Sequence, residues 1–404
     1  GTTDVTLYAD WQVPVVGVSG SEQSDEFGAN VDISGDYALL GSTNAETAYV
    51  FHRSADGTWD SGFELVEPAG DSYTNEGSDR FGQRVAIAGD YAAVAEKNSD
   101  ENGQNSGAVH IYRRTGTNTW AYSTELAPAT QLDGGDSFGS AIDMAGNYLV
   151  VGASGDDGVN QFGLGAAYVF YRTGQDAWSS GAKLSAYDAA DNDNLGLSIA
   201  TSGDYTVVGA TGRDDNGSNS GAAYVFRRTG TNEWDTGEKL LASDGVADDR
   251  FGYSVAIDGD YVAVSTRNDD YGGASGVGAV WVFHRTGPDN AWDNGTKIQS
   301  PVVETAAYFG GERDTVGLSG DHLVVGQKDN TDNGSPDAGA AWVFERTGTN
   351  SWSAPSQLLP EDGDAYDGFG YSVALDGDYA VIGAWRDEFE GVNSSGSAYI
   401  WKYR

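Results

Sequence analysis

One loop of the sequence places oxygen-bearing side chains at the spacing of a calcium-binding loop. Residues 329–337 follow the pattern D-x-T-x-N-G-x-x-D, in which the candidate ligands are the side chains of Asp329, Thr331, Asn333 and Asp337 and the carbonyl of Ser335. Gly334 permits the sharp turn that such a loop requires. We therefore name Ca²⁺ as the possible cofactor, with a dissociation constant on the order of 10⁻⁴–10⁻³ M, because only two of these side chains are charged. The alternative is an acidic turn that binds no metal.

Aromatic residues form a second group of candidates, at positions where the repeat described below carries small or polar residues. Trp385 takes the position held elsewhere by Ser154 and Thr211, and Phe389 follows it four residues later. Tyr271 lies in a corresponding loop of another repeat. Aromatic side chains on loops can stack on sugar rings or anchor a partner protein. Trp385, Phe389 and Tyr271 are therefore candidate ligand-binding residues, and the alternative is packing within the loops.

Basic residues recur near the starts of the same loops. They are Lys97, Arg213, Arg267, Lys328 and Arg386, in a chain that has only 22 Lys and Arg residues. On an otherwise acidic face, they could hold a carboxylate or a sulfate group of a ligand. The alternative is that they neutralise neighbouring aspartates in surface ion pairs.

Catalysis finds little support in the sequence. The four histidines, His52, His110, His284 and His322, all fall in register with the repeat, so no set of histidine, carboxylate and nucleophile stands out. Carboxylate pairs that could hydrolyse glycosides are not distinctive, because acidic residues are abundant on one face. We therefore expect a non-catalytic protein.

Composition and charge exclude several classes of partner. The 404 residues include 61 Asp and Glu, and the net charge is −39, which argues against nucleic-acid binding and against docking on an anionic membrane. No apolar run is long enough to insert into a bilayer. The absence of cysteine excludes disulfides, thiolate metal sites and thiol nucleophiles. High negative charge also suits a salt-rich extracellular setting, with divalent cation binding as the competing explanation.

The elements that position these residues come from a sevenfold internal repeat. Six Phe-Gly steps and one Leu-Gly variant recur, at Phe27, Phe81, Phe138, Leu195, Phe251, Phe309 and Phe369. A Gly-Asp-Tyr-like step follows eight residues later in six units, and three residues later still in the sixth, at Gly320. Tryptophan also recurs, and Trp11 is the seventh copy. Successive units are therefore about 58 residues long.

Each unit reads as four β-strands and no helix. In the fifth unit, residues 254–257 alternate, Asp258-Gly259 gives the signal of a tight hairpin, and residues 261–264 return. The apolar run 279–283 predicts a strand that is buried on both faces. A last strand is expected around Trp292 and Ile298.

Seven units of four strands predict an all-β fold, a seven-bladed β-propeller in one domain, residues 1–404. The chain stops at Tyr399-Ile400-Trp401, which is the third strand of the last unit. We therefore expect residues 1–18 to supply the outer strand of the last blade and to close the ring non-covalently.

The repeat resembles that of FG-GAP repeat proteins, which are related to the propeller of integrin α subunits. The resemblance rests on the run Phe251 to Tyr261, on Val208-Gly209-Ala210 and on the run Gly221 to Phe226. It implies seven blades, with ligands bound on the face that carries the longer loops. Integrin-type repeats hold Ca²⁺ in a loop between the first two strands, but here that hairpin is too short to wrap a cation.

Strand direction separates the loops into two faces. The short Asp-Gly and Arg-Thr-Gly turns share one face, and we expect the Arg-Thr-Gly turns to be scaffold. The long acidic loops share the other, the long-loop face, where we expect function. An Asp two residues before most Phe-Gly steps suggests either a ring of metal ligands or an Asx-type turn.

We therefore expect a secreted or surface-displayed adhesion module that binds a glycan or an extracellular protein on the long-loop face. The alternatives are a structural component of an extracellular assembly and a polysaccharide-cleaving enzyme.

Overall fold

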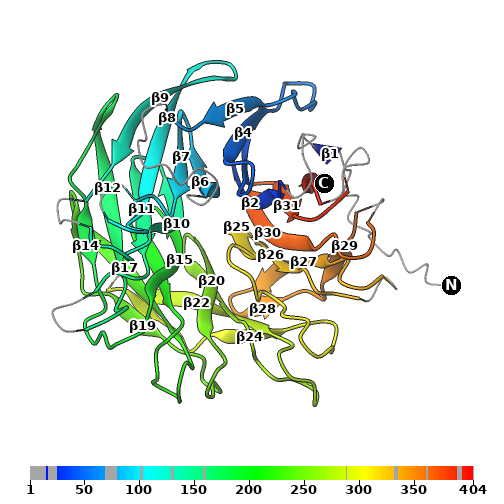
Figure 1. The fold of residues 1–404 in the computed structure, drawn as a ribbon. Coiled ribbons are helices and arrows are strands. Elements are labelled where there is room, and N and C mark those ends of the chain that lie inside the picture. The colour runs from blue at the N-terminus through cyan, green and yellow to red at the C-terminus, as the bar shows by residue number, and fades with distance from the viewer. Residues whose placement is uncertain are drawn as a thin grey trace.

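The computed structural model describes residues 15–16, 25–68, 80–100, 103–128, 132–157, 161–287, 289–331, 335–360, 363–388 and 394–403. Seven antiparallel sheets stand around a central axis as the blades of a propeller (Figure 1). None of the described residues forms a helix that could cross a membrane. The predicted seven-bladed, all-β fold is confirmed.

The strands of each blade follow the order of the chain. Blade 1 contains β2 (Phe27–Ser34), β3 (Tyr37–Ser42), β4 (Thr47–His52) and β5 (Phe63–Val66). Blade 2 contains β6 (Phe81–Ala88), β7 (Tyr91–Glu96), β8 (Ala108–Gly116) and β9 (Thr119–Leu126). Blade 3 contains β10 (Phe138–Ala145), β11 (Tyr148–Ala153), β12 (Ala166–Gly174), β13 (Ala177–Trp178) and β14 (Ala182–Leu184). Blade 4 contains β15 (Leu195–Ser202), β16 (Tyr205–Ala210), β17 (Ala222–Gly230), β18 (Glu233–Trp234) and β19 (Glu238–Leu240).

The last three blades repeat the plan. Blade 5 contains β20 (Phe251–Asp258), β21 (Tyr261–Thr266), β22 (Ala279–Gly287), β23 (Ala291–Trp292) and β24 (Thr296–Gln299). Blade 6 contains β25 (Val316–Ser319), β26 (His322–Gln327), β27 (Ala340–Gly348), β28 (Ser351–Trp352) and β29 (Ser356–Leu358). Blade 7 contains β30 (Phe369–Asp376), β31 (Tyr379–Ala384) and β32 (Ser397–Lys402), with β1 (Val15–Val16) beside β32.

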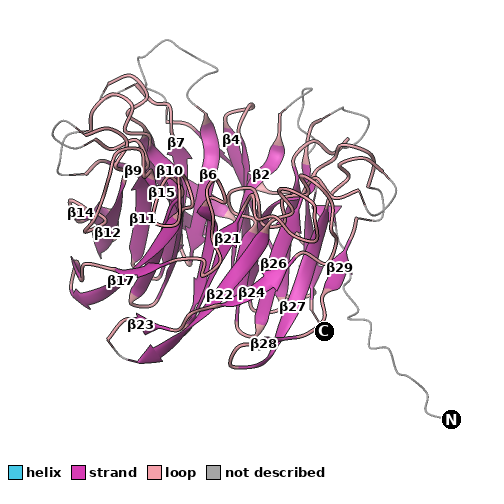
Figure 2. Cartoon of the chain, turned by 90° about the horizontal axis from the view of Figure 1, so that it is seen from below, coloured by secondary structure: helices cyan, strands magenta, loops and turns pink. Residues whose placement is uncertain are grey.

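The first strand of every blade lines a central channel of about 360 Å³. Two-residue turns such as Gly259-Asp260 join the first and second strands, which confirms that these hairpins are short. Figure 2 shows the two kinds of connection on opposite sides, with the longer loops at the top and the short turns at the bottom. The long-loop face is therefore the upper side of the molecule in Figure 2.

The outer strand differs from the expectation of one continuous strand. In blades 3 to 6 it is broken into two short pieces. In blade 5 the carboxylate of Asp293 accepts hydrogen bonds from the backbone nitrogens of His284 (3.1 Å) and Gly295 (2.9 Å), and this turn separates β23 from β24. Blade 2 has Ala121 at the corresponding position, and its outer strand β9 is unbroken.

The aromatic ring of the Phe-Gly step packs inside its own blade, against the end of the third strand. In blade 5, Phe251 lies edge-on to Phe283, with 6.1 Å between the ring centroids. Both rings are almost fully buried, and the cluster around them also includes Val207, Val225 and Leu240 of blade 4. The hydrophobic core is thus a series of layers between neighbouring blades rather than one central mass.

The glycine of the Phe-Gly step fixes how closely two blades approach. Gly252 has a φ of +91°, which L-residues with a side chain rarely adopt, and a Cβ on it would lie 2.4 Å from the carbonyl oxygen of Ala222 in blade 4. On the other side of the same seam, a Cβ on Gly209 would lie 2.1 Å from the carbonyl oxygen of Gly252. Five seams have such a second-strand glycine, and the other two have Ala95 or Ser265 in its place.

Side chains on the first strands join each blade to the next along the channel. Asp32 of blade 1 accepts a hydrogen bond from the backbone nitrogen of Ile87 in blade 2 (2.6 Å), and Asp376 of blade 7 accepts one from Gly35 of blade 1 (2.6 Å). Burial raises the pKa of Asp143, which bonds Thr201 in the same way, to about 6. The contact between Asp376 and Gly35 shows that blades 7 and 1 meet through the same kind of seam as the others.

On the short-turn face, the Arg-Thr-Gly turns hold neighbouring blades together. The Arg228 guanidinium lies 4.6 Å from the centroid of the Tyr148 ring in the preceding blade and donates a hydrogen bond to its hydroxyl (2.8 Å). The same pairing recurs for Arg114 with Tyr37, Arg172 with Tyr91, Arg285 with Tyr205, Arg346 with Tyr261 and Arg53 with Tyr379. These turns are therefore scaffold, as predicted.

The N-terminal segment is described only at β1. Val15 and Val16 pair antiparallel with Tyr399 and Ala398 of β32, the edge that the sequence predicted for the closing strand. Trp11 and the other residues of the segment 1–18 lie outside the described residues. Closure of the ring by the whole segment stays a prediction.

The seam between blades can be tested with a matched pair of glycine substitutions. Gly252→Ala adds a methyl group against the Ala222 carbonyl at a left-handed φ, whereas Gly259→Ala has a φ of +56° and open space around the added carbon. We expect Gly259→Ala to cost about 1–2 kcal/mol from backbone strain alone, and Gly252→Ala to cost about 1–3 kcal/mol more from overpacking. Urea unfolding measures both values. Equal losses in the two variants would contradict close packing at the seam.

Candidate functional site

The seven blades differ from one another at the mouth of the channel on the long-loop face. The first residue after the second strand is small and polar in three blades, namely Thr43, Ser154 and Thr211. In the other four blades it is Lys97, Arg267, Lys328 or Trp385. Because the blades repeat the same geometry, these four larger side chains lie around one end of the channel.

An insertion in blade 6 reaches across this mouth. The three extra residues between Phe309 and Gly320 shorten the first strand, so β25 begins only at Val316. At the end of the insertion, the carboxylate of Asp314 accepts a hydrogen bond from Asn30 of blade 1 (2.8 Å) and lies 3.5 Å from Nε of Arg84 in blade 2. The carbonyl of Asp314 accepts a hydrogen bond from the backbone nitrogen of Val373 in blade 7 (2.7 Å). The segment 311–314 is therefore fixed to three other blades.

Two of the predicted cations hold this insertion in place. Arg267 donates hydrogen bonds to the Gly311 carbonyl and to Glu312 (3.2 Å), and its guanidinium lies 4.8 Å from the ring centroid of Tyr253. The Lys328 ammonium lies 3.5 Å from the same Glu312 carboxylate. Burial tends to lower the pKa of Arg267, but the charge and hydrogen bond of Glu312, together with Tyr253 and Tyr308, outweigh it and raise that pKa. Arg267 and Lys328 thus lie in ion pairs, as the alternative interpretation expected.

The remaining cations at the mouth are Arg84, which pairs with Asp314, and Lys97 and Arg313. Arg84 donates hydrogen bonds to the carbonyls of Ser140 (3.3 Å) and Gln83 (2.8 Å). Lys97 and Arg313 make no hydrogen bond or ion pair with any residue that the structure describes. Burial, together with the charges of Arg313, Arg84 and Arg80, lowers the pKa of Lys97 to about 8.

Arg313 experiences the same environment. Burial lowers its pKa first, and the positive charge of Arg84 lowers it further. The nearby Tyr253, Asp314 and Tyr371 only partly offset these two effects. The mouth of the channel is therefore a locally positive place in a protein with a net charge of −39.

Trp385 lies at the same mouth and is half-buried. Its ring centroid is 4.8 Å from that of Tyr371 on the first strand of blade 7, and the Arg386 guanidinium lies 3.9 Å from the indole centroid. Burial raises the pKa of Tyr371, and the Glu312 charge of the insertion raises it further, which places this aromatic pair beside the segment 311–314. Arg386 is exposed, and among the described residues it has no ion-pair partner.

A pocket of about 460 Å³ opens beside this group, between blades 7 and 1. Its lining includes Glu26, Tyr366, Arg386 and Glu388. Tyr366 is 58% exposed, so an aromatic ring stands at the edge of the pocket. The volume falls within the range of small-molecule sites in proteins.

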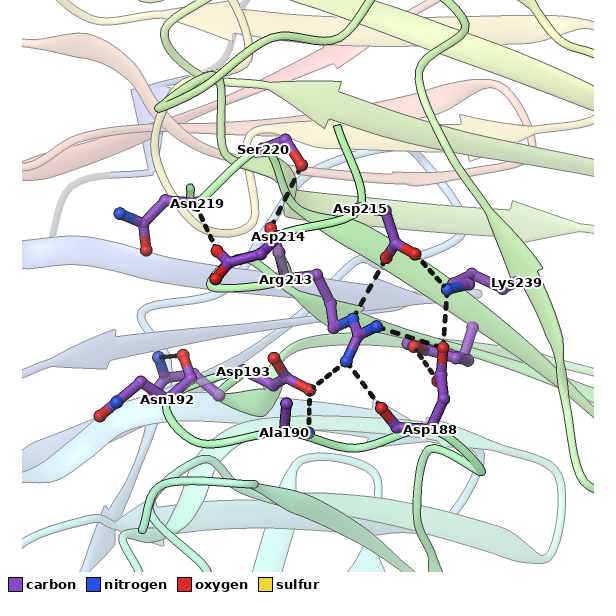
Figure 3. Close-up of polar contacts among 12 residues, drawn as sticks. Asp188, Ala190, Asn192, Asp193, Arg213, Asp214, Asp215, Asn219, Ser220 and Lys239 are labelled. Carbon is purple, nitrogen blue, oxygen red and sulfur yellow. Dashed lines mark hydrogen bonds and ion pairs between the residues drawn. The ribbon is translucent and has the colours of Figure 1, made fainter. Parts of the chain in front are cut away.

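The remaining cation of the predicted set, Arg213, belongs to an internal network in blade 4 (Figure 3). Its guanidinium contacts Asp193 (2.9 Å), Asp188 (3.2 Å) and Asp215 (3.2 Å), and Lys239 contacts two of the same carboxylates. Burial raises the pKa of Asp188, but the hydrogen bonds from Lys239 and Tyr224 and the charges of Arg213 and Lys239 together outweigh it, so that the pKa is lowered. Every charge in this network has a partner, so Arg213 stabilises a loop.

The other predicted residues do not gather at the mouth or lie outside the description. Tyr271 is 38% exposed in a tight turn in which its backbone pairs with Ala274. Phe389 lies outside the described residues. Four Asp residues before the Phe-Gly or Leu-Gly steps each accept a hydrogen bond from the backbone nitrogen three residues earlier, as Asp193 does from Ala190 (2.6 Å); they are Asp136, Asp193, Asp249 and Asp367. An Asx turn would bond a backbone nitrogen two residues later, so the turn differs from the predicted type. These hydrogen bonds support the structural interpretation of those residues.

The predicted calcium loop is described in part. Both carboxylate oxygens of Asp329 accept hydrogen bonds from Lys328 (2.7 and 2.8 Å), and the hydroxyl of Thr331 donates one to Glu304 (2.7 Å). Asn333 lies outside the described residues, whereas Ser335 and Asp337 are within them. No group of three or more acidic or histidine ligands gathers elsewhere in the described chain. The calcium site stays a prediction.

Sequence reasoning missed Arg84, Arg313 and Tyr371. Arg84 and Tyr371 lie inside first strands, where we looked for scaffold rather than function. Arg313 lies in the insertion that delays Gly320 by three residues, and that departure from the repeat was the available signal.

Comparison with known proteins identifies the repeat. A family model for the FG-GAP repeat matches residues 75–112, 128–170, 178–226, 234–283 and 352–401, which together make up more than half of the chain. The chain belongs to the FG-GAP repeat family. Several of these FG-GAP matches begin at the outer strand of one blade and end with the third strand of the next, so the sequence repeat itself spans a seam.

Other comparisons extend the fold but not the function. No curated protein matches the chain. Among solved structures, hydrazine synthase of Kuenenia stuttgartiensis is similar, with a TM-score of 0.53 and 12% identity over 95% of this FG-GAP chain and 96% of the other. At that identity, the similarity concerns the fold alone.

The unpaired state of Lys97 gives a prediction about pH. The folded state lowers the pKa of Lys97 from 10.5 to about 8. Between about pH 8 and 10.5, the Lys97 side chain is therefore mostly protonated in the unfolded chain and mostly neutral in the folded protein. Below pH 8 the charged Lys97 lowers the free energy of unfolding by up to about 3 kcal/mol. This destabilisation decreases as the pH rises and is absent at about pH 10.5. We expect Lys97→Met to be more stable than the wild type at pH 7 and equal to it near pH 10.5 in urea unfolding.

The matched control is Lys402→Met, at an exposed position at the other end of a blade. Its difference from the wild type should not change with pH over this range. A gap between wild type and Lys97→Met that stays constant from pH 7 to 10.5 would contradict the burial of an unpaired ammonium.

Proposed function

We propose that this FG-GAP propeller is a non-catalytic extracellular recognition module that binds a glycan on its long-loop face, over the channel mouth and the adjacent pocket. The observation that carries the proposal is the grouping of Trp385, Tyr371 and Arg386 beside the pocket between blades 7 and 1. A repeat scaffold requires none of these side chains at this place, since other blades have Ser154 or Thr211 where blade 7 has Trp385.

The chemistry of the pocket supports a glycan. Sugar rings present apolar faces that stack on aromatic side chains and hydroxyl groups that bond to carboxylates and guanidinium groups. In the lining, Tyr366 offers aromatic surface, while Glu26, Arg386 and Glu388 offer polar groups. The Trp385 indole lies against Arg386, next to this lining. Because Arg386 is exposed and forms no ion pair in the described part of the chain, it can move from the indole when a ligand arrives. A protein ligand would instead require a larger contact over the loops.

The rigid scaffold also supports a binding role. The short-turn face is taken up by repeated contacts between arginine and tyrosine, whereas the long-loop face carries the exposed rings of Phe162, Tyr187, Tyr271 and Tyr366. Seven similar seams hold these loops in place. The loops therefore lose little conformational entropy when a ligand binds to them.

Trp385→Ala tests the proposal. On a glycan array that contains neutral, sulfated and carboxylated oligosaccharides, we expect the wild type to bind and the variant to lose at least about tenfold in affinity, the effect of an aromatic anchor. Circular dichroism and thermal unfolding should show that the variant remains folded.

Tyr187→Ala is the matched control, because Tyr187 is 61% exposed on the same face but lies in the connection between blades 3 and 4. Its glycan affinity should equal that of the wild type. If the wild type binds no glycan, or if Trp385→Ala binds as well as the control, the proposed site is wrong. Loss of binding in Tyr271→Ala would show that the ligand extends over blade 5.

A further inference from the structure

The charges of the channel mouth do not balance. Arg267 pairs with Glu312, Lys328 with Asp329 and Glu312, and Arg84 with Asp314. Lys97 and Arg313 form no ion pair with any carboxylate of the described residues. Within the described part of the chain, the mouth therefore carries two cations, Lys97 and Arg313, that no ion pair neutralises.

This imbalance contrasts with the way the same chain treats its other buried cations. Arg213 contacts three carboxylates, and Lys239 and Lys297 contact two each. With 61 acidic residues available, a structural cation in this protein normally has a partner. Bringing Lys97, Arg313 and Arg84 together costs free energy through mutual repulsion and through burial. A bound anion would remove that cost.

The cations are also held in place rather than free to separate. Asp314 fixes the insertion to blades 1, 2 and 7, so the backbone of the adjacent Arg313 is anchored over the channel. Arg84 is held by its bond to the Ser140 carbonyl of blade 3. Hydrogen-bond donors that are already in position lose little conformational entropy when they bind an anion.

An unused polar group lies at the same place. The side-chain oxygen of Gln83, next to Arg84, is buried and has no hydrogen-bond partner among the described residues. A buried amide normally uses its hydrogen-bonding capacity. Its carboxamide is thus available to bond to a ligand that enters the mouth.

We infer that Lys97 and Arg313, supported by Arg84, form a binding site for one oxyanion group at the long-loop mouth of the channel. Guanidinium and ammonium groups suit sulfate, phosphate and carboxylate oxygens, which accept several charge-assisted hydrogen bonds at once. The inference deepens the proposed function and rests on it for one point, namely that the oxyanion is an acidic substituent of the bound glycan. The glycan is then a sulfated or a carboxylated one.

The experiment uses simple anions first, so that it does not depend on the glycan. Sodium sulfate, phosphate and acetate are titrated into the full chain by isothermal calorimetry at constant ionic strength. We expect one site for at least one of these anions, and a loss of about tenfold or more in affinity for Lys97→Gln and for Arg313→Gln, because each removes a charge-assisted hydrogen bond. Lys402→Gln removes one charge from an exposed position at the opposite end of a blade and should bind as the wild type does.

A second readout separates binding from folding. The anion should raise the pKa of the Lys97 ammonium, followed by NMR of the lysine side chains, by one unit or more. It should also raise the melting temperature of the wild type more than that of Lys97→Gln. Absence of anion binding, or equal binding by the wild type, Lys97→Gln and Arg313→Gln, would overturn the site.

The source of the oxyanion is decided with sulfated, phosphorylated and carboxylated oligosaccharides of matched length. Preference for one of them that is lost in Lys97→Gln assigns the substituent. If the simple anions bind but no oligosaccharide does, the anion site stands and the glycan proposal fails. If oligosaccharides bind equally with and without acidic groups, the glycan proposal stands and the anion site is not part of it.

Discussion

The close approach of the glycine in the Phe-Gly or Leu-Gly step to a backbone carbonyl of the preceding blade, seen at five of the seven seams, is the constraint on which the rest of the propeller depends. Gly252 combines a left-handed backbone with a carbonyl only 2.4 Å from where its side chain would begin, and the glycines of the other first strands share its positive φ. This contact sets the distance between blades. It therefore also sets how far apart the first strands stand and how wide the channel is.

Once the seams are fixed, the two faces of the ring become unequal. On the short-turn face, paired arginine and tyrosine side chains repeat from blade to blade, and a change in one is matched by a change in its partner. Blade 6 has His322 in place of the tyrosine, and Tyr403 of blade 7 lies against it in place of the arginine, with 4.3 Å between the ring centroids. The long-loop face has no such requirement beyond the aspartate turns that precede the Phe-Gly steps, so insertions and bulky side chains can accumulate there.

The fold could be predicted almost completely from the sequence, because the seam imposes Phe-Gly at a regular period. The breaks in the outer strands could not be predicted from the sequence. The hairpin pattern does not show that the Asp293 carboxylate binds two backbone nitrogens, those of His284 and Gly295, at the break. The site was predicted only in part. Trp385 and Lys97 stood out against small residues in other blades. Arg84 likewise stands where blades 1 and 7 have Asn30 and Ser372, but it lies inside a first strand, where scaffold was expected. Tyr371 lies inside a first strand as well. Ion pairing of Arg213 and Lys328 depends on loop geometry, which the sequence does not contain.

The central claim is that the departures from the repeat meet at one end of the channel and hold an acidic group there. A crystal structure of the protein grown with selenate, measured at the selenium absorption edge, tests this most directly. The account predicts an anomalous peak at the long-loop mouth, within hydrogen-bonding distance of the Lys97 ammonium and the Arg313 guanidinium. An empty mouth, with selenate absent or bound only at other lysines and arginines of the surface, would contradict it.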